Sequence, residues 1–264
     1  MCRILFAAGN GHEIRELLDA FVRSSENDPY KARRNRGSQH KDGWGYVLLK
    51  RDTVEHYRSM TPVFQDEAVQ RLRNRLSGFT VLIAHSRAAS QGSRNLFNVQ
   101  PFGFSSRRGF SFWFLHNGDL KKDMIIRMAE LGAEKLENAS DSFTAAVYLC
   151  RFLEGSTKEN LLARFKELKK TTNTALNTVT LMIDPLNNVR AFITSYMTGR
   201  IEDAPQKRDY YRLLLLSKKN LFAVASSTFE LYHEGPFQDV ENGDAFHVEI
   251  SFENEGFAVE RLRI

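Results

Sequence analysis

The succession of strand-like and helix-like segments constrains the fold of this chain more than any other feature of its 264 residues. Apolar stretches with the length of strands occur in the first half at residues 3–9, 43–51, 53–60, 79–84 and 110–115. A second group of predicted strands fills the last third, at residues 174–184, 188–197, 211–217, 221–227, 244–252 and 256–263. Helical patterns gather between the two groups, at about 121–132, 141–154 and 158–169. Grouped strands and helices, rather than strict alternation, predict a layered α+β fold.

Two further helices are predicted near the N-terminus. Asn10 followed by Glu13 is typical of a helix start, and an apolar stripe continues from there to Phe21. A second apolar stripe at helical spacing surrounds Leu72. Between them, residues 24–39 are polar and basic and are predicted to form a loop.

The later part of the chain contains one more helix-start signal and no sign of a domain boundary. Ser156 with Glu159 resembles a capping box for the helix predicted at 158–169. The sequence contains no internal repeat, low-complexity tract or linker. Residues 1–264 are therefore expected to form a single domain.

Composition narrows the class of protein. Hydrophobic residues make up 42% of the chain, enough for a continuous core, but the longest aliphatic run, residues 213–216, is far too short to cross a bilayer. The first residues lack the layout of a signal peptide. Two cysteines, Cys2 and Cys150, do not make a disulfide framework, which favours a reducing compartment. We expect a cytoplasmic protein without membrane segments.

The formal charge of +5 raises the question of nucleic-acid binding. The densest basic clusters are Lys31, Arg33, Arg34 and Arg36, and then Arg107 with Arg108. Neither cluster is interleaved with the stacking aromatic residues of a single-strand binder. Solvated loop charge is the favoured interpretation, and the same residues could attract an anionic substrate.

Cys2 directly follows the initiator methionine. Removal of Met1 would leave one residue that carries both a thiol and a free α-amine, whose ordinary pKa values are about 8.5 and about 8. An N-terminal nucleophile can use its own amine as proton acceptor and donor. Taken alone, Cys2 also fits a small apolar residue at the start of a strand.

A polar cluster follows the predicted strand 110–115. Asn117 offers an amide donor, and Gly118 lets its backbone N–H approach a ligand without a side chain in the way. These are the parts of an oxyanion hole. The alternative is a plain Asn-Gly turn between a strand and a helix.

Two charged residues sit where they could hold a zwitterion. Arg87 follows a buried strand and is suited to a bidentate grip on a carboxylate, although a surface salt bridge is the alternative. Asp141 precedes a predicted helix and could hold an ammonium group or cap that helix. Gly43 and Gly45 flank Trp44 and suggest a close backbone approach, either to neighbouring chain or to the Cys2 region.

The sequence predicts no metal and no cofactor. His40, His85 and His116 lie far apart without a further cysteine or carboxylate at ligand spacing, and no nucleotide-binding motif occurs. His56, His233 and His247 are expected within strands as structural residues.

Taken in order, these pieces resemble the class II glutamine amidotransferases, which are N-terminal nucleophile hydrolases, and most closely their stand-alone bacterial and archaeal branch. The matching segments are Met-Cys2, His40-x-Asp42-Gly43-Trp44-Gly45, His85-x-Arg87, Asn98-x-x-Pro101-Phe102, His116-Asn117-Gly118, Ser140-Asp141-Ser142, Ala223–Ser227 and Val240–Asp244. Two departures occur: Gln100 replaces the histidine of the Asn-x-His-Pro segment, and Phe143 replaces an acidic residue.

The resemblance implies a four-layer αββα sandwich and hydrolysis of a glutamine side-chain amide through a γ-glutamyl thioester on Cys2, releasing ammonia. It implies that Arg87 binds the substrate α-carboxylate and Asp141 its α-ammonium. Asn117 and the Gly118 N–H would stabilise the oxyanion, with site support from His85, His116, Gly43 and Trp44.

Three readings of the function stay open at this stage. The substrate could be glutamine, with ammonia passed to a synthase partner subunit or released. It could instead be a γ-glutamyl peptide or conjugate, which shares the same head group. A catalytically silent scaffold is the third reading.

Overall fold

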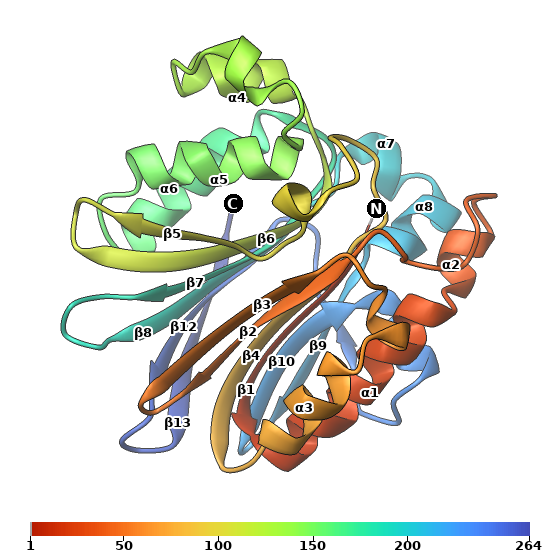
Figure 1. Cartoon of the computed structure of the whole chain (residues 1–264), viewed down its shortest axis with the longest axis vertical. Helices are drawn as coiled ribbons and strands as arrows, with labels where there is room; N and C mark the ends of the chain where they lie inside the picture. Colours follow the sequence, from red (N-terminus) through yellow and green to blue (C-terminus); the bar gives the residue numbers. More distant parts are fainter. Residues whose placement is uncertain (1) are drawn as a thin grey trace.

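The chain folds into two antiparallel sheets packed face to face between outer helices, in a computed structural model that describes residues 2–264, the side chains of residues 133 and 135 excepted (Figure 1). The predicted α+β sandwich is confirmed.

The first sheet contains seven strands in the order β11-β9-β10-β1-β4-β2-β3. Their bounds are β1 Arg3–Asn10, β2 Trp44–Lys50, β3 Thr53–Ser59, β4 Phe79–Ser86, β9 Leu213–Lys218, β10 Leu221–Ser226 and β11 Gln238–Asp239. The first strand, β1, lies inside this sheet between β10 and β4, with Arg3 opposite Ser86 and Ile4 opposite His85. The start of the chain is therefore held between two neighbours.

The second sheet contains six strands in the order β13-β12-β8-β7-β6-β5. Their bounds are β5 Phe102–Ser106, β6 Phe110–Leu120, β7 Thr172–Ile183, β8 Val189–Ser195, β12 Asp244–Ser251 and β13 Gly256–Arg263. β6 pairs with β7 along most of its length, and the register shifts between Gly118 and Leu120.

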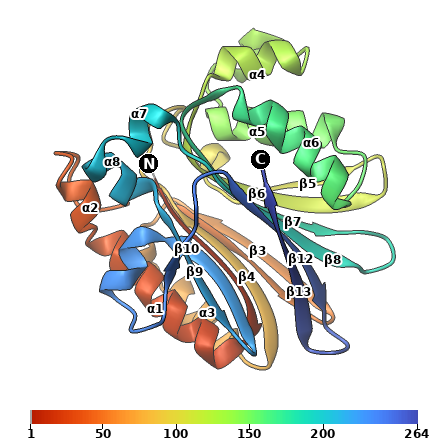
Figure 2. The ribbon, with the colours of Figure 1, turned by 180° about the vertical axis from the view of Figure 1, so that it is seen from behind.

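Helices cover the outer face of each sheet. α1 and α3 lie on the seven-stranded sheet, whereas α5 and α6 lie on the six-stranded sheet with α4 beyond them (Figures 1 and 2). The bounds are α1 Gly11–Glu26, α2 Pro29–Ala32, α3 Ala68–Arg75, α4 Lys122–Met128, α5 Asp141–Phe152, α6 Lys158–Lys169, α7 Gly199–Glu202 and α8 Pro205–Tyr211. No helix within residues 2–264 is long and apolar enough to span a membrane.

Alternation along β1 explains why residues 4–8 in its middle are all apolar. Ile4 and Phe6 point into the core between the sheets, whereas Leu5 and Ala7 pack under the outer helices. Both faces of this strand are buried, and its charged first residue, Arg3, forms an ion pair with Asp28. By the same alternation, Cys2 lies on the inter-sheet side of the chain, two positions before Ile4.

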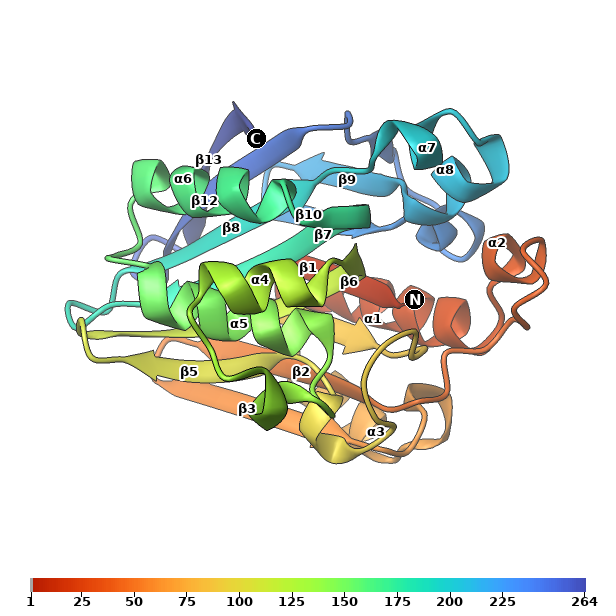
Figure 3. The ribbon, with the colours of Figure 1, turned by 90° about the horizontal axis from the view of Figure 1, so that it is seen from above.

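One end of the sandwich carries additional short elements. α2, α7 and α8 lie at the end where the chain begins, near the loop that follows β4 (Figure 3). The N-terminal residue of β1 and the C-terminal residue of β4 are opposite each other at this end. Side chains from several distant segments can therefore meet there.

Several local predictions were wrong. α1 continues to Glu26 and α2 follows from Pro29, so residues 24–39 are not a continuous loop. The cap of α6 is Thr157, whose side chain accepts from Asn160 N, and not Ser156. His233 follows a 3-10 helix, Ser227–Leu231, and is not in a strand. β5, β11, α7 and α8 were not predicted.

Candidate active site

Cys2 lies immediately before β1, at the crowded end of the sandwich. Its residue is 8% exposed, so the thiol is close to the surface but not free in solvent. Its backbone nitrogen donates to Asn117 Oδ1 over 2.9 Å, and its Sγ lies 3.9 Å from the carbonyl oxygen of Ala88. The Cys2 backbone is thus joined to β6 of the second sheet, and its thiol contacts the segment that follows β4. The predicted loss of Met1 concerns a residue outside those that the structure describes.

Asn117 and Gly118 lie inside β6. Asn117 is opposite Asn177 of β7, so the prediction that the polar cluster follows the strand was wrong, as was the alternative of a turn. A Cβ at Gly118 would lie 1.9 Å from the carbonyl oxygen of Ala175, so only glycine fits. Asn117 Nδ2 is buried and has no hydrogen-bond partner within the described chain. An unsatisfied buried donor is costly unless a ligand accepts from it.

Arg87 follows the last residue of β4 and is 3% exposed. Its Nη2 donates to the carbonyl oxygens of Gln91 and Ser93, both at 3.2 Å, whereas its Nη1 is buried without a partner. Burial lowers the pKa of Arg87, and the charges of Cys2 and Asp42 oppose that shift. No ion pair of Arg87 occurs among residues 2–264, so a surface salt bridge does not explain it.

Asp141 is the first residue of α5 and is 3% exposed. The helix cap is its neighbour Ser140, whose side chain accepts from Phe143 N, so Asp141 is not the cap. Asp141 Oδ2 accepts from the backbone nitrogen of Leu120 over 2.7 Å. Burial raises the pKa of Asp141, and no described basic residue forms an ion pair with it.

His116 connects three elements near the site. Its Nδ1 lies 2.9 Å from Ser142 Oγ, and its Nε2 lies 3.0 Å from the carbonyl oxygen of Ala175. Its backbone nitrogen donates to Gln100 Oε1 over 2.6 Å. Both ring nitrogens are occupied, so these contacts hold β6 against α5 and β7. Gln100, which replaces the family's histidine, contributes to this frame.

His85 lies in β4 on the same inter-sheet side as Ile83, and its two ring nitrogens are buried without a partner in the described chain. Burial, reinforced by the charge of Arg87, lowers the pKa of His85 to about 3. The imidazole is therefore neutral near pH 7. The His85 side chain therefore lines the site as an uncharged group.

Gly43 and Trp44 have different surroundings. Gly43 accepts from the backbone nitrogen of Arg87 over 2.8 Å, and a Cβ there would lie 2.7 Å from the carbonyl oxygen of Ser59. Trp44 packs in the layer between sheet and α1, where its Nε1 donates to Asp66 Oδ2 over 2.9 Å. The close approach at these glycines is thus to neighbouring chain, and Trp44 lies away from Cys2.

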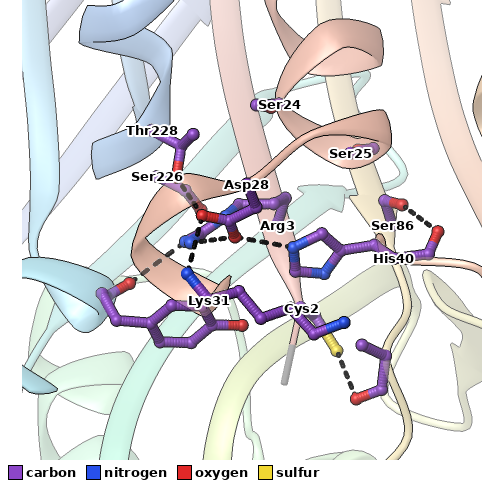
Figure 4. A network of polar contacts seen from close by, with 12 residues as sticks. Cys2, Arg3, Ser24, Ser25, Asp28, Lys31, His40, Ser86, Ser226 and Thr228 are labelled. Carbon is purple, nitrogen blue, oxygen red and sulfur yellow. Dashed lines mark hydrogen bonds and ion pairs between the residues drawn. The ribbon is translucent and has the colours of Figure 1, made fainter. Parts of the chain in front are cut away.

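A buried charged network beside Cys2 was missed by sequence reasoning (Figure 4). Arg3 donates to Asp28 Oδ2 through Nε over 2.7 Å, and His40 Nε2 lies 2.8 Å from the same oxygen. Lys31 is only 9% exposed, so the prediction that its basic cluster is solvated was wrong for this residue. Asp28 before Pro29 was the available signal, because this pair is typical of a helix start.

Among residues 2–264, no group of three or more histidine, cysteine, aspartate or glutamate residues could hold a metal ion. A cavity of about 810 Å³ lies at another part of the molecule, lined by residues 49–54, 183, 186–189 and 250–253. It contains no cysteine or histidine. Cys2, Arg87, Asn117 and Asp141 do not line this cavity.

The sequence matches the class-II glutamine amidotransferases over residues 25–184, which is more than half of the chain. This protein belongs to that family. No curated protein matches its sequence.

Solved structures confirm the fold. The glutamine phosphoribosylpyrophosphate amidotransferase from B. subtilis, complexed with ADP and GMP, is 16% identical with a TM-score of 0.60. A structure described as the allosteric regulatory enzyme of purine biosynthesis is 17% identical with a TM-score of 0.63. Both matches cover 98% of this chain but 49% of the other, so this chain spans about half their length.

A third structure has a similar length. The glutamine aminotransferase class-II domain protein from Silicibacter pomeroyi is 15% identical with a TM-score of 0.51, and the match covers 97% of this chain and 98% of that one. At these identities the likeness is one of fold.

Proposed function

We propose that this chain hydrolyses the side-chain amide of glutamine through a thioester on Cys2 and releases ammonia. The observation that carries the proposal is the set of unsatisfied polar groups around Cys2. Asn117 Nδ2 and Arg87 Nη1 are buried without partners. The Asp141 carboxylate accepts from Leu120 N and from Ser142 Oγ but forms no ion pair among the described residues. A zwitterionic amide substrate would supply a partner to the two unsatisfied donors and a cation to Asp141.

The proposed roles follow from the charge of each group. Arg87 would bind the α-carboxylate and Asp141 the α-ammonium of the substrate. Asn117 Nδ2 and the Gly118 N–H would donate to the oxyanion that forms when Cys2 attacks the amide carbon. His116, Gln100 and Gly43 would hold these residues in place and take no part in the chemistry.

In the first step, Cys2 Sγ forms a bond to the amide carbon and the thiol proton passes to the Cys2 α-amine. The tetrahedral adduct then expels ammonia, which takes that proton, and a thioester remains. Water attacks the thioester with the same amine as base, and glutamate leaves. The scheme requires that Met1 be removed first.

The acceptor of the ammonia and the organisation of the chain are also proposals. The predicted single domain 1–264 would work either as a free amidohydrolase in the cytoplasm or beside a synthase partner subunit. A γ-glutamyl peptide would use Arg87 and Asp141 in the same way, because it has the same head group. A silent scaffold is the alternative that lacks turnover altogether.

Product assays separate these alternatives. We expect ammonia release from glutamine by the chain without Met1, no release by Cys2→Ala and full release by Cys150→Ala. Faster amine release from γ-glutamyl dipeptides than from glutamine would identify a conjugate hydrolase. No turnover with either substrate would favour the catalytically silent scaffold and contradict the proposal.

A further inference from the structure

Lys31 is a buried lysine whose charge is not compensated by an ion pair. Its residue is 9% exposed, and its Nζ donates to the backbone carbonyl oxygen of Gln39. Among residues 2–264, no carboxylate lies within ion-pair distance of that Nζ. Lysine is rarely buried without a paired charge, and an ammonium group has three donors to satisfy. Its position therefore calls for an anion.

The nearby carboxylate of Asp28 is already occupied. Its Oδ2 accepts from Arg3 and contacts His40, and its Oδ1 accepts from Thr228 Oγ1 and from the backbone nitrogen of Lys31. The charge of Asp28 is balanced by Arg3, with which it forms a fully buried ion pair. The Lys31 ammonium is left as the excess charge of this network.

The Lys31 side chain extends toward Cys2. In Figure 4 it leaves α2 and passes beside Arg3 and Asp28 on the way to the Cys2 side chain. Burial lowers the pKa of Lys31, and the charges of Asp28, Asp42 and Cys2 act against that shift. The Cys2 side chain is therefore close enough for its charge to act on the Lys31 ammonium, and both residues are buried.

The other charged and titratable groups around this pair come from β1, from α8 and from the segments that follow α1, α2 and β4. Burial lowers the pKa of His40 to about 3, so this histidine is neutral near pH 7. Arg87 is a second cation whose pKa responds to Cys2, but its proposed task is the substrate carboxylate. The remaining groups are Arg3 and Asp28, Asp42 with its 3.5 Å contact to Arg94, and Tyr210.

We propose that Lys31 is the counter-ion of the thiolate that Cys2 forms when its proton passes to the α-amine, a positioning residue that stabilises the nucleophile in its reactive form. The proposal rests on the proposed function for the use made of the thiolate. It does not depend on which amide is cleaved. A cation beside a thiol favours its ionised form, and the thiolate is the species that attacks. Lys31 would also disfavour rotation of Sγ away from the site.

Alkylation of Cys2 tests this without any substrate. The chain without Met1 is treated with iodoacetamide across a range of pH, and labelling of Cys2 is measured by peptide mass with Cys150 as internal reference. For Lys31→Met we expect a rate–pH profile displaced upward by about one unit, which is about tenfold slower labelling near pH 7. Lys31→Arg should restore the wild-type profile to within about twofold.

Two outcomes would overturn the proposal. One is a Lys31→Met profile that overlays the wild type. The other is a Lys31→Arg profile that matches Lys31→Met, since this would show that packing matters and charge does not. Thermal unfolding identifies variants that do not fold. Failure of the proposed function is recognised separately, because a wild-type Cys2 that is alkylated but releases no ammonia from glutamine contradicts that function alone.

If Lys31→Met does not fold, the wild-type chain can still test the proposal. The Lys31 side-chain nitrogen is then titrated by nitrogen-15 NMR before and after carboxamidomethylation of Cys2. We expect the pKa of Lys31 to fall once the thiolate is removed, because the Cys2 charge raises it. An unchanged pKa of Lys31 would contradict the proposal.

Discussion

The backbone nitrogen of Cys2 donates to Asn117 Oδ1 over 2.9 Å, which joins residues 115 positions apart in the sequence. The bond links the start of β1 in one sheet to β6 in the other. It also fixes the orientation of the Asn117 amide, since an acceptor oxygen turned to Cys2 leaves Nδ2 as the donor without a partner. One contact thus sets the nucleophile and the proposed oxyanion donor relative to each other.

The Asn117→Asp variant should separate the contact with Cys2 from the proposed donation to the oxyanion. The variant keeps an oxygen that can accept from Cys2, but it loses the Nδ2 donor and places a carboxylate beside the forming oxyanion. We expect kcat for glutamine to fall by at least about 10²–10³-fold, the usual cost of one oxyanion donor, with little change in KM. Steady-state kinetics measure both. The Cys2 alkylation rate serves as the control for an intact nucleophile, and an unchanged kcat would remove Asn117 from the oxyanion hole.

The Asp141→Asn variant tests whether Asp141 binds the α-ammonium of the substrate. Loss of a charged partner should lower kcat/KM for glutamine by about tenfold to a hundredfold. Glutaric acid monoamide lacks the α-amine, so the variant and the wild type should cleave it at similar rates. Equal losses on both substrates would show that Asp141 acts only through its contact with Leu120.

The pH dependence of glutamine binding should reflect the same carboxyl group. Burial raises the pKa of Asp141, and only its ionised form attracts the α-ammonium. We therefore expect KM for glutamine to rise as the pH falls through this raised pKa. The KM of glutaric acid monoamide should lack that rise. A parallel rise for both amides would assign the effect to another group.

Two buried histidines predict how stability depends on pH. Burial lowers the pKa of His40 and of His85 to about 3, so the unfolded chain binds protons that the folded chain does not between about pH 3 and 6.5. The free energy of unfolding should fall as the pH decreases through this window, by up to about 1.4 kcal/mol per pH unit for each histidine. Urea denaturation of wild type and His85→Leu measures the slope, which the substitution should reduce by one histidine's share. An unchanged slope would contradict a buried neutral His85.

Gly118→Ala should damage β6 locally. The added Cβ would lie 1.9 Å from the carbonyl oxygen of Ala175, so the pairing with β7 must shift. We expect a loss of about 1–3 kcal/mol in the free energy of unfolding and a lower kcat. Gly155→Ala is the matched control, because nothing lies within 4 Å of a Cβ there. Equal stability of both variants would show that β6 tolerates a side chain at position 118.

The layered fold could be predicted from the sequence because its signal is local. β1 and β4 are buried on both faces and are apolar over residues 4–8 and 81–84, and α5 and α6 follow clear helical patterns. Predictions erred where polar residues continue an apolar strand. β6 includes His116 through Asp119 because β7 pairs with it as far as Gly118. Pairing with a strand more than 50 residues away leaves no local signal in the sequence.

The order of the family motifs pointed to Cys2, Arg87, Asn117 and Asp141, whose roles in the site stay proposals. The surroundings of other residues could not be predicted, and Trp44 packs in the layer between the sheet and α1. Lys31 was expected in solvent because it belongs to a basic run. Its burial depends on the carbonyl oxygen of Gln39 and on α2, and these features exist only in the folded chain.

The most direct test of the central claim is the intact mass of the protein after exposure to a diazoketone or chloroketone that mimics glutamine. We predict a chain that has lost Met1 and gained one adduct, located on Cys2, absent in Cys2→Ala and retained in Cys150→Ala. No adduct on a folded chain without Met1, or an adduct on Cys150, would contradict the assignment of Cys2 as the nucleophile for a γ-glutamyl amide.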